Sequence, residues 1–191
     1  MAAFPFKDGD FVLFQGASTV ESGRYDDPSG LGYGFAGIIK GLLAGVAPGV
    51  RVEVVNRGIS GNRTVELLAR WKEDCLDLAP THLSIHVGLN DLLREFDGQP
   101  EETVRLPEFK ANYRNLLDQA KGAGIESLIL MEPTMTDVDL NHPSNAACEE
   151  YSVAVEEIAG EYGAVFVPAR KALLAAIAQG PSVEYWVPDG R

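Results

Sequence analysis

The sequence predicts a three-layer α/β sandwich built on a parallel sheet. Five short apolar runs alternate along the chain with longer stretches of helical periodicity. The apolar runs are continuous instead of alternating with polar residues, which is typical of parallel strands covered on both faces. With 191 residues, the chain is long enough to bury one large core. We therefore expect residues 1–191 to form a single domain whose strands are joined by right-handed crossovers.

The first half of the chain supplies three strands and the helices between them. The opening strand is the run FVLF, and a glycine-rich turn follows it. Each later strand is a short run of Val, Ile or Leu, and each helix carries apolar residues at helical spacing. In order, we expect a strand at 11–14, a helix at about 33–45, a strand at 52–55, a helix at 64–78 and a strand at 83–87.

The second half completes the pattern with two more strands. A helix is expected from about 107 to 121, where Pro107 suits a first helical turn. The remaining elements are a strand at 125–131, a helix at 145–162, a strand at 164–167 and a short helix through Ala178. The longest irregular segments are 19–32 and 133–144, and loops of that length are more often functional than idle.

Composition and charge exclude several function classes. Hydrophobic residues make up 46% and charged residues 23%, which are ordinary values for a globular protein. The net charge of −12 argues against a nucleic-acid partner or an anionic membrane surface, since both require a basic patch. No apolar run approaches the ~20 residues that span a bilayer, and the start lacks a secretory signal. We expect a cytoplasmic protein whose two cysteines, Cys75 and Cys148, are free thiols.

Three loop residues follow the first three strands and suggest acyl-transfer chemistry. Ser18 follows strand one, Gly61 follows strand two and Asn90 follows strand three. If the strand order is 2-1-3, these loops are neighbours, because adjacent strands lie ~4.8 Å apart. A serine hydroxyl beside a glycine N–H and an asparagine amide can act as a nucleophile beside an oxyanion hole. Taken one at a time, each residue also has a structural explanation. Ser18 is typical of a turn, Gly61 of a backbone position with positive φ, and Asn90 or Asp91 of the cap of the helix-like stretch 92–96.

The combination resembles the GDSL or SGNH hydrolases, a family of serine esterases. The segments that carry the resemblance are FVLFQGAST, NRGISGNRT, HVGLND and the terminal Pro188-Asp189-Gly190-Arg191. Within the family, the chain is most similar to short bacterial carbohydrate acetylesterases, including acetylxylan esterases. The resemblance runs nearly end to end, and it implies a flavodoxin-like fold with strand order 2-1-3-4-5.

The resemblance also implies an acyl-enzyme mechanism. Ser18 would attack the acetyl carbonyl, while its own N–H, the Gly61 N–H and the Asn90 side chain would hold the oxyanion. Asp189 would orient a histidine that accepts the serine proton. No metal and no cofactor is expected, and the partner would be a small-molecule or oligosaccharide ester.

The sequence departs from the family pattern at two positions. Alanine stands at position 17, where the family usually has aspartate. The family's histidine would fall directly after Arg191, where the sequence ends. Loss of a triad histidine costs about 10⁶-fold in kcat in subtilisin, so we expect the 191 residues alone to be almost inert. We expect the natural protein to be longer and to carry a final helix, because an uncovered sheet face would favour self-association.

The alternative hypothesis is a catalytically disabled carbohydrate- or acyl-binding protein, favoured by Ala17 and by the missing histidine. Of the three histidines, His82 and His86 share one face of strand three and are expected to be packing residues. Only His142, in an Asp139-x-x-His142 pattern, offers a substitute base.

A glycine pattern raises one further alternative. Residues 32–37 match Gly-x-Gly-x-x-Gly, which can bind a dinucleotide. That motif should directly follow a strand, whereas here a long irregular segment intervenes. We therefore do not expect a dinucleotide site.

Overall fold

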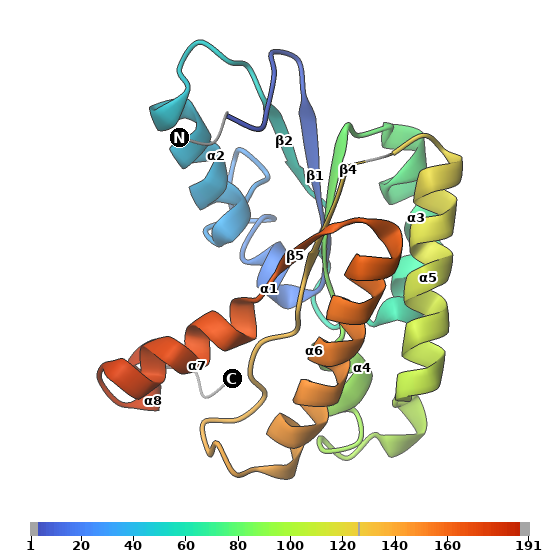
Figure 1. Cartoon of the computed structure of the whole chain (residues 1–191), viewed down its shortest axis with the longest axis vertical. Helices are drawn as coiled ribbons and strands as arrows, with labels where there is room; N and C mark the ends of the chain where they lie inside the picture. The colour runs from blue at the N-terminus through green and yellow to red at the C-terminus, as the bar shows by residue number, and fades with distance from the viewer. Residues whose placement is uncertain (1–3, 126, 188–191) are drawn as a thin grey trace.

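The computed structural model describes residues 4–125 and 127–187, and it places five parallel strands in one sheet with helices on both sides (Figure 1). The strand order is β2-β1-β3-β4-β5, as expected for the flavodoxin-like topology. Since β1 pairs with both β2 and β3, the carboxyl ends of the first three strands meet at one edge. The strands are β1 (Phe11–Gly16), β2 (Glu53–Asn56), β3 (His82–His86), β4 (Ser127–Met131) and β5 (Val165–Val167).

The helices form the two outer layers. Helices α3, α5 and α6 lie on one side of the sheet, and α2 and α7 lie on the other (Figure 1). The bounds are α1 (Ser18–Glu21), α2 (Phe35–Val46), α3 (Thr64–Asp74), α4 (Leu89–Leu93), α5 (Leu106–Gly122), α6 (Pro143–Tyr162), α7 (Ala169–Gln179) and α8 (Val183–Trp186). Two 3₁₀ turns, Leu76–Leu78 and Pro100–Glu102, complete the described elements.

Two apolar clusters hold the layers together. Alternate strand residues point to opposite faces, so Leu13 packs with the α3–α5–α6 layer whereas Val12 and Phe14 pack toward α2. The largest buried side chains, Trp71 and Tyr113, belong to the first cluster. At about 25 cal/mol per Å² of apolar area, each such side chain contributes a few kcal/mol of hydrophobic free energy.

The predicted elements are confirmed with shifts at their ends. The strand expected to end at residue 14 continues to Gly16, because it pairs with His86 of β3. The helix expected over 64–78 breaks at Cys75 into α3 and a 3₁₀ turn. Ile125, where the strand was expected to begin, instead lies in the turn after α5, since its N–H donates to the carbonyl of Ala120; β4 is described from Ser127.

The two cysteines and His82 also have the structural roles that the sequence predicts. Cys75 and Cys148 are free and buried, and burial raises the pKa of each thiol to about 12. His82 bridges neighbouring elements, with Nδ1 2.7 Å from Ser127 Oγ and Nε2 3.0 Å from Asp10 Oδ2. In the described part of the chain, none of the helices combines the length and the apolar character needed to cross a bilayer.

Candidate active site

Ser18 opens the short helix α1 just beyond the carboxyl end of β1. A Cβ on Gly16 would overlap the backbone oxygen of His86, so only glycine lets β1 and β3 approach so closely here. The turn is held by the Ala17 carbonyl, which accepts from the N–H groups of Val20 and Glu21. Ala17 makes no side-chain cap bond, and Ser18 is exposed at the start of the helix.

Gly61 occupies a tight turn in the loop that joins β2 to α3. The Asn62 N–H donates to the carbonyl of Ile59 at 3.2 Å, and Gly61 has a φ of +82° at the third position of this turn. That conformation favours glycine, as in a type II turn. The Ile59 N–H in turn donates to Gly16 O at 3.1 Å, which ties this loop to the end of β1.

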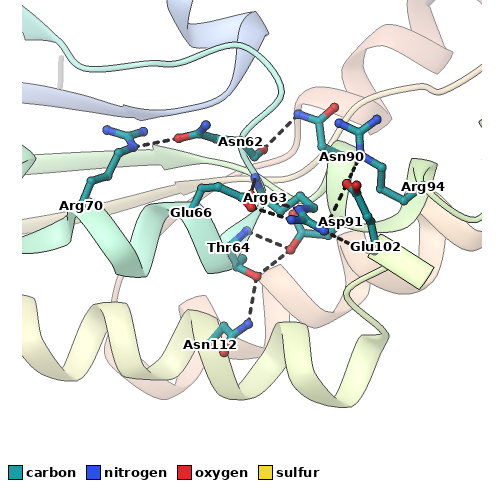
Figure 2. A network of polar contacts seen from close by, with 10 residues as sticks. All are labelled: Asn62, Arg63, Thr64, Glu66, Arg70, Asn90, Asp91, Arg94, Glu102 and Asn112. Atoms are coloured by element: carbon teal, nitrogen blue, oxygen red, sulfur yellow. Dashed lines mark hydrogen bonds and ion pairs between the residues drawn. The ribbon is translucent and has the colours of Figure 1, made fainter. Parts of the chain in front are cut away.

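Asn90 lies in the first turn of α4 and reaches across to the Gly61 loop. Its Nδ2 donates to the carbonyl of Asn62 at 3.0 Å (Figure 2). The alternative interpretation of Asn90 or Asp91 as a helix cap is wrong, because the N-cap is Gly88 and no side chain bonds there. Gly88 has a φ of +129°, and a Cβ on it would press on the Phe109 ring. The tertiary contact with Asn62, not helix capping, therefore orients the Asn90 amide.

Ser18 and Asn90 line the same cleft, which has a volume of about 590 Å³. Its other lining residues are Thr19, Ser22, Gly34, Phe35, Leu89, Leu93, Thr134 and Met135. Gly61 is not part of this lining, but it is adjacent in sequence to Asn62, which the Asn90 amide contacts. Asp189 lies outside the described residues. Of the four candidate residues, the structure thus brings two into one cleft and places the third beside it.

A buried carboxyl, that of Asp91, fixes the position of α4, the helix that carries Asn90. Asp91 Oδ1 accepts from the N–H and the hydroxyl of Thr64, at 2.9 and 2.6 Å, and so joins α4 to the start of α3 (Figure 2). Asn112 of α5 donates to the same hydroxyl at 3.2 Å. Burial raises the pKa of Asp91 to about 6, and its Oδ2 has no partner among the described residues.

Two further residues hold the site loops, and sequence reasoning missed both. Buried Asn56 at the end of β2 donates to the carbonyl of Val20 at 2.6 Å and so fixes α1. Arg70 of α3 donates to Gly16 O at 3.3 Å and to Asn62 Oδ1 at 2.8 Å. The contacts from Asn56 to Val20 and from Arg70 to Gly16 join residues far apart in sequence, so no local pattern predicts them. The one available signal is for Asn56, a polar residue at the end of an apolar strand.

The three histidines have structural roles. Burial lowers the pKa of His86 to about 4, and its ring packs edge-on against Phe35. His142 caps α6, because its Nδ1 accepts from the Ser144 N–H at 3.3 Å, and the same nitrogen lies 2.7 Å from Ser144 Oγ. The Asp139 carboxylate accepts instead from the backbone of Asn141. The side chains of Asp139 and His142 therefore bond to different partners and do not form the acid–base pair that their spacing suggested.

The glycine-rich segment 32–37 serves close packing. A Cβ on Gly32 would press on the backbone oxygens of Glu21 and Ser22, and a Cβ on Gly37 would overlap the oxygen of Gly32. These glycines let the loop run against α1, so their spacing has a structural explanation. Within 4–125 and 127–187, no group of three or more His, Cys, Asp or Glu side chains is arranged to hold a metal ion.

Comparison with known proteins adds three findings. The family model for the GDSL-like lipase/acylhydrolase family matches residues 14–190. An acetylxylan esterase of Geobacillus stearothermophilus is 35% identical over 172 residues, which are 86% of this chain and 78% of that protein. The crystal structure of the acetylxylan esterase Axe2 from the same organism superposes with a TM-score of 0.88 at 31% identity, covering 95% of this chain and 85% of that one.

Proposed function

Because the chain belongs to the GDSL-like lipase/acylhydrolase family, we propose that it hydrolyses short acyl esters of carbohydrates, acetyl esters above all, through an acyl-enzyme on Ser18. Family membership makes the chain a carboxylic-ester hydrolase. The carbohydrate and acetyl preference is supported by its similarity to proteins named acetylxylan esterases.

One observation carries the proposal for the site. Ser18 and Asn90 line a single cleft at the carboxyl edge of the sheet, and the Asn90 amide is oriented by Asn62. One hydrogen of that Nδ2 is used by Asn62 O, and among residues 4–125 and 127–187 the other has no acceptor, so it can donate to a ligand. A pre-oriented donor beside an exposed serine is the arrangement that acyl transfer requires, since it stabilises the charge that develops on the carbonyl oxygen.

In the proposed reaction, Ser18 Oγ bonds to the carbonyl carbon of the ester. The oxygen of the tetrahedral intermediate accepts from the N–H of Ser18, the N–H of Gly61 and Asn90 Nδ2. The bond between the carbonyl carbon and the sugar oxygen then breaks, and that oxygen takes up the proton lost by Ser18 and leaves as a hydroxyl. Water then attacks the acyl carbon, which releases acetate and returns a proton to Ser18 Oγ. The family resemblance assigns the proton transfers to a histidine oriented by Asp189, beyond the described residues.

Labelling of Ser18 tests this proposal. The natural full-length protein is treated with a fluorophosphonate, which bonds only to an activated serine, and the modified peptide is identified by mass spectrometry. Acetate release from acetylated xylo-oligosaccharides is measured in parallel. We expect the label on Ser18, and we expect Ser18→Ala to abolish both signals. Ser22→Ala is the matched control, because Ser22 lines the same cleft. An unlabelled Ser18 would favour the carbohydrate- or acyl-binding alternative.

The remaining expectations concern location and partners. We propose a cytoplasmic protein whose only partner in the reaction is a small-molecule or oligosaccharide ester, with no nucleic acid and no membrane. The net charge of −12 supports the exclusion of polyanionic partners. Self-association stays a prediction, which sedimentation of the purified protein measures.

A further inference from the structure

Arg94 stands at the end of α4 with its guanidinium held by two acidic residues. Its Nη1 donates to Asp97 Oδ2 at 2.6 Å, and its Nε lies 3.7 Å from Glu102 Oε2 (Figure 2). The Arg94 side chain is 19% exposed. An arginine held at two points loses less conformational entropy on binding a ligand than a free surface arginine does.

The guanidinium lies near Gly61, one of the proposed oxyanion donors. Arg94 follows Asn90 by four residues, and residues at this spacing share one face of a helix. Both side chains extend in Figure 2 toward the loop that carries Asn62. A Cβ built on Gly61 would lie 4.0 Å from Arg94 Nη2. Arg94 Nη2 therefore lies close to Gly61, next to the cleft that Ser18 and Asn90 line, although Arg94 itself is not one of the lining residues.

The nitrogen that faces Gly61 also has hydrogen-bonding capacity to spare. In the described ranges, the guanidinium of Arg94 donates one hydrogen bond, from Nη1 to Asp97. Asp97 and Glu102 balance the positive charge, and Glu102 is shared with Arg63 at 3.7 Å. A donor whose charge is already balanced suits a neutral oxygen acceptor better than an anion, and carbohydrates present hydroxyl and ether oxygens.

We propose that Arg94 is a substrate-binding residue that donates from Nη2 to a sugar oxygen next to the acetylated carbon. This inference rests on the proposed function and names a specificity determinant for it. The contact places the acetyl group against Ser18 and Asn90, so binding energy from the sugar orients the reacting ester. An ester without a sugar cannot make this contact.

The test compares two substrates in Arg94→Gln. Acetylated xylo-oligosaccharides carry the sugar oxygens, whereas 4-nitrophenyl acetate does not. We expect kcat/KM for the sugar ester to fall about 10- to 100-fold further than kcat/KM for the aryl ester, as expected from loss of one charged hydrogen bond. Most of that change is expected in KM, because the contact forms with the bound sugar.

Two more variants complete the design. Arg94→Lys keeps a cation near Asp97 but loses the planar fork, and we expect the same shift in substrate preference. Arg105→Gln is the control, because Arg105 is 67% exposed and pairs with Glu95 nearby. Equal losses of kcat/KM on both substrates in both Arg94 variants would overturn the inference in favour of a purely structural role for Arg94. Wild-type kcat/KM on both substrates in both variants would overturn it too. A wild-type protein inactive on both esters would instead refute the proposed function.

Discussion

Replacing Asp91 with asparagine should remove a pH dependence of stability that this buried carboxyl creates. Asp91 is fully buried, and its Oδ1 accepts two hydrogen bonds from Thr64. An asparagine oxygen accepts the same two bonds, and its amide nitrogen takes the place of Oδ2, which has no recorded partner in the described chain. The substitution therefore preserves shape and contacts while abolishing the charge.

The magnitude follows from the pKa of Asp91. Burial, opposed by the Thr64 bonds, raises it from 3.8 to about 6, and Glu66 adds a repulsive charge. The folded state thus binds a proton more tightly than the unfolded state, so the free energy of unfolding falls as pH rises from about 4 to about 6. A shift of about 2 pKa units corresponds to about 3 kcal/mol, all of it lost above pH 6.

Urea unfolding at several pH values measures this effect. The difference in unfolding free energy between Asp91→Asn and the wild type should rise by about 3 kcal/mol between pH 4 and pH 7. Asp77→Asn is the control, since Asp77 forms an exposed pair with Lys72. If the profiles of Asp91→Asn and the wild type run parallel across this range, Asp91 does not titrate in the way its burial requires.

Three other predictions follow from the site and its supports. Asn90→Ala should lower kcat for 4-nitrophenyl acetate about 10²- to 10³-fold, while loss of its bond to Asn62 costs only about 1 kcal/mol of stability, and an unchanged kcat would remove Asn90 from the oxyanion site. Gly16→Ala should destabilise the protein by about 1–3 kcal/mol in urea unfolding, because its Cβ overlaps His86, whereas Gly41→Ala, in open space, should not. A backbone N–H holds the pKa of Asp10 below 3.8, so Asp10→Asn should cost about 1 kcal/mol at pH 7 and less below pH 4; an equal cost at both contradicts this.

Much of the fold was predictable because its signals are local. Continuous apolar runs marked all five strands, and helical periodicity marked the long helices α2, α3, α5 and α6. The short helices α1 and α8 were not foreseen, since four residues carry no periodicity. The end of β1 was misplaced because strand ends depend on pairing with a neighbouring strand, which no local pattern records.

The candidate site was likewise predictable in part: which residues meet there could be predicted, but how they are held could not. Ser18 and Asn90 could be predicted as neighbours, because parallel strands in this order bring their carboxyl ends together. The capping role offered for Asn90 was wrong, since its amide binds the carbonyl of Asn62 instead. The supports from Asn56 to Val20 and from Arg70 to Gly16 were missed, because these partners lie far away in sequence.

The sequence by itself determined which elements form, in what order, and which residue types stand at the ends of the first three strands, because periodicity and motif spacing are properties of the chain alone. Only the tertiary structure decided how those residues are oriented. Contacts with other loops and helices orient the amide of Asn90, bury the carboxyl of Asp91 and hold the guanidinium of Arg94. Hydrogen bonding and desolvation act through space, so their effects appear only once the chain is folded.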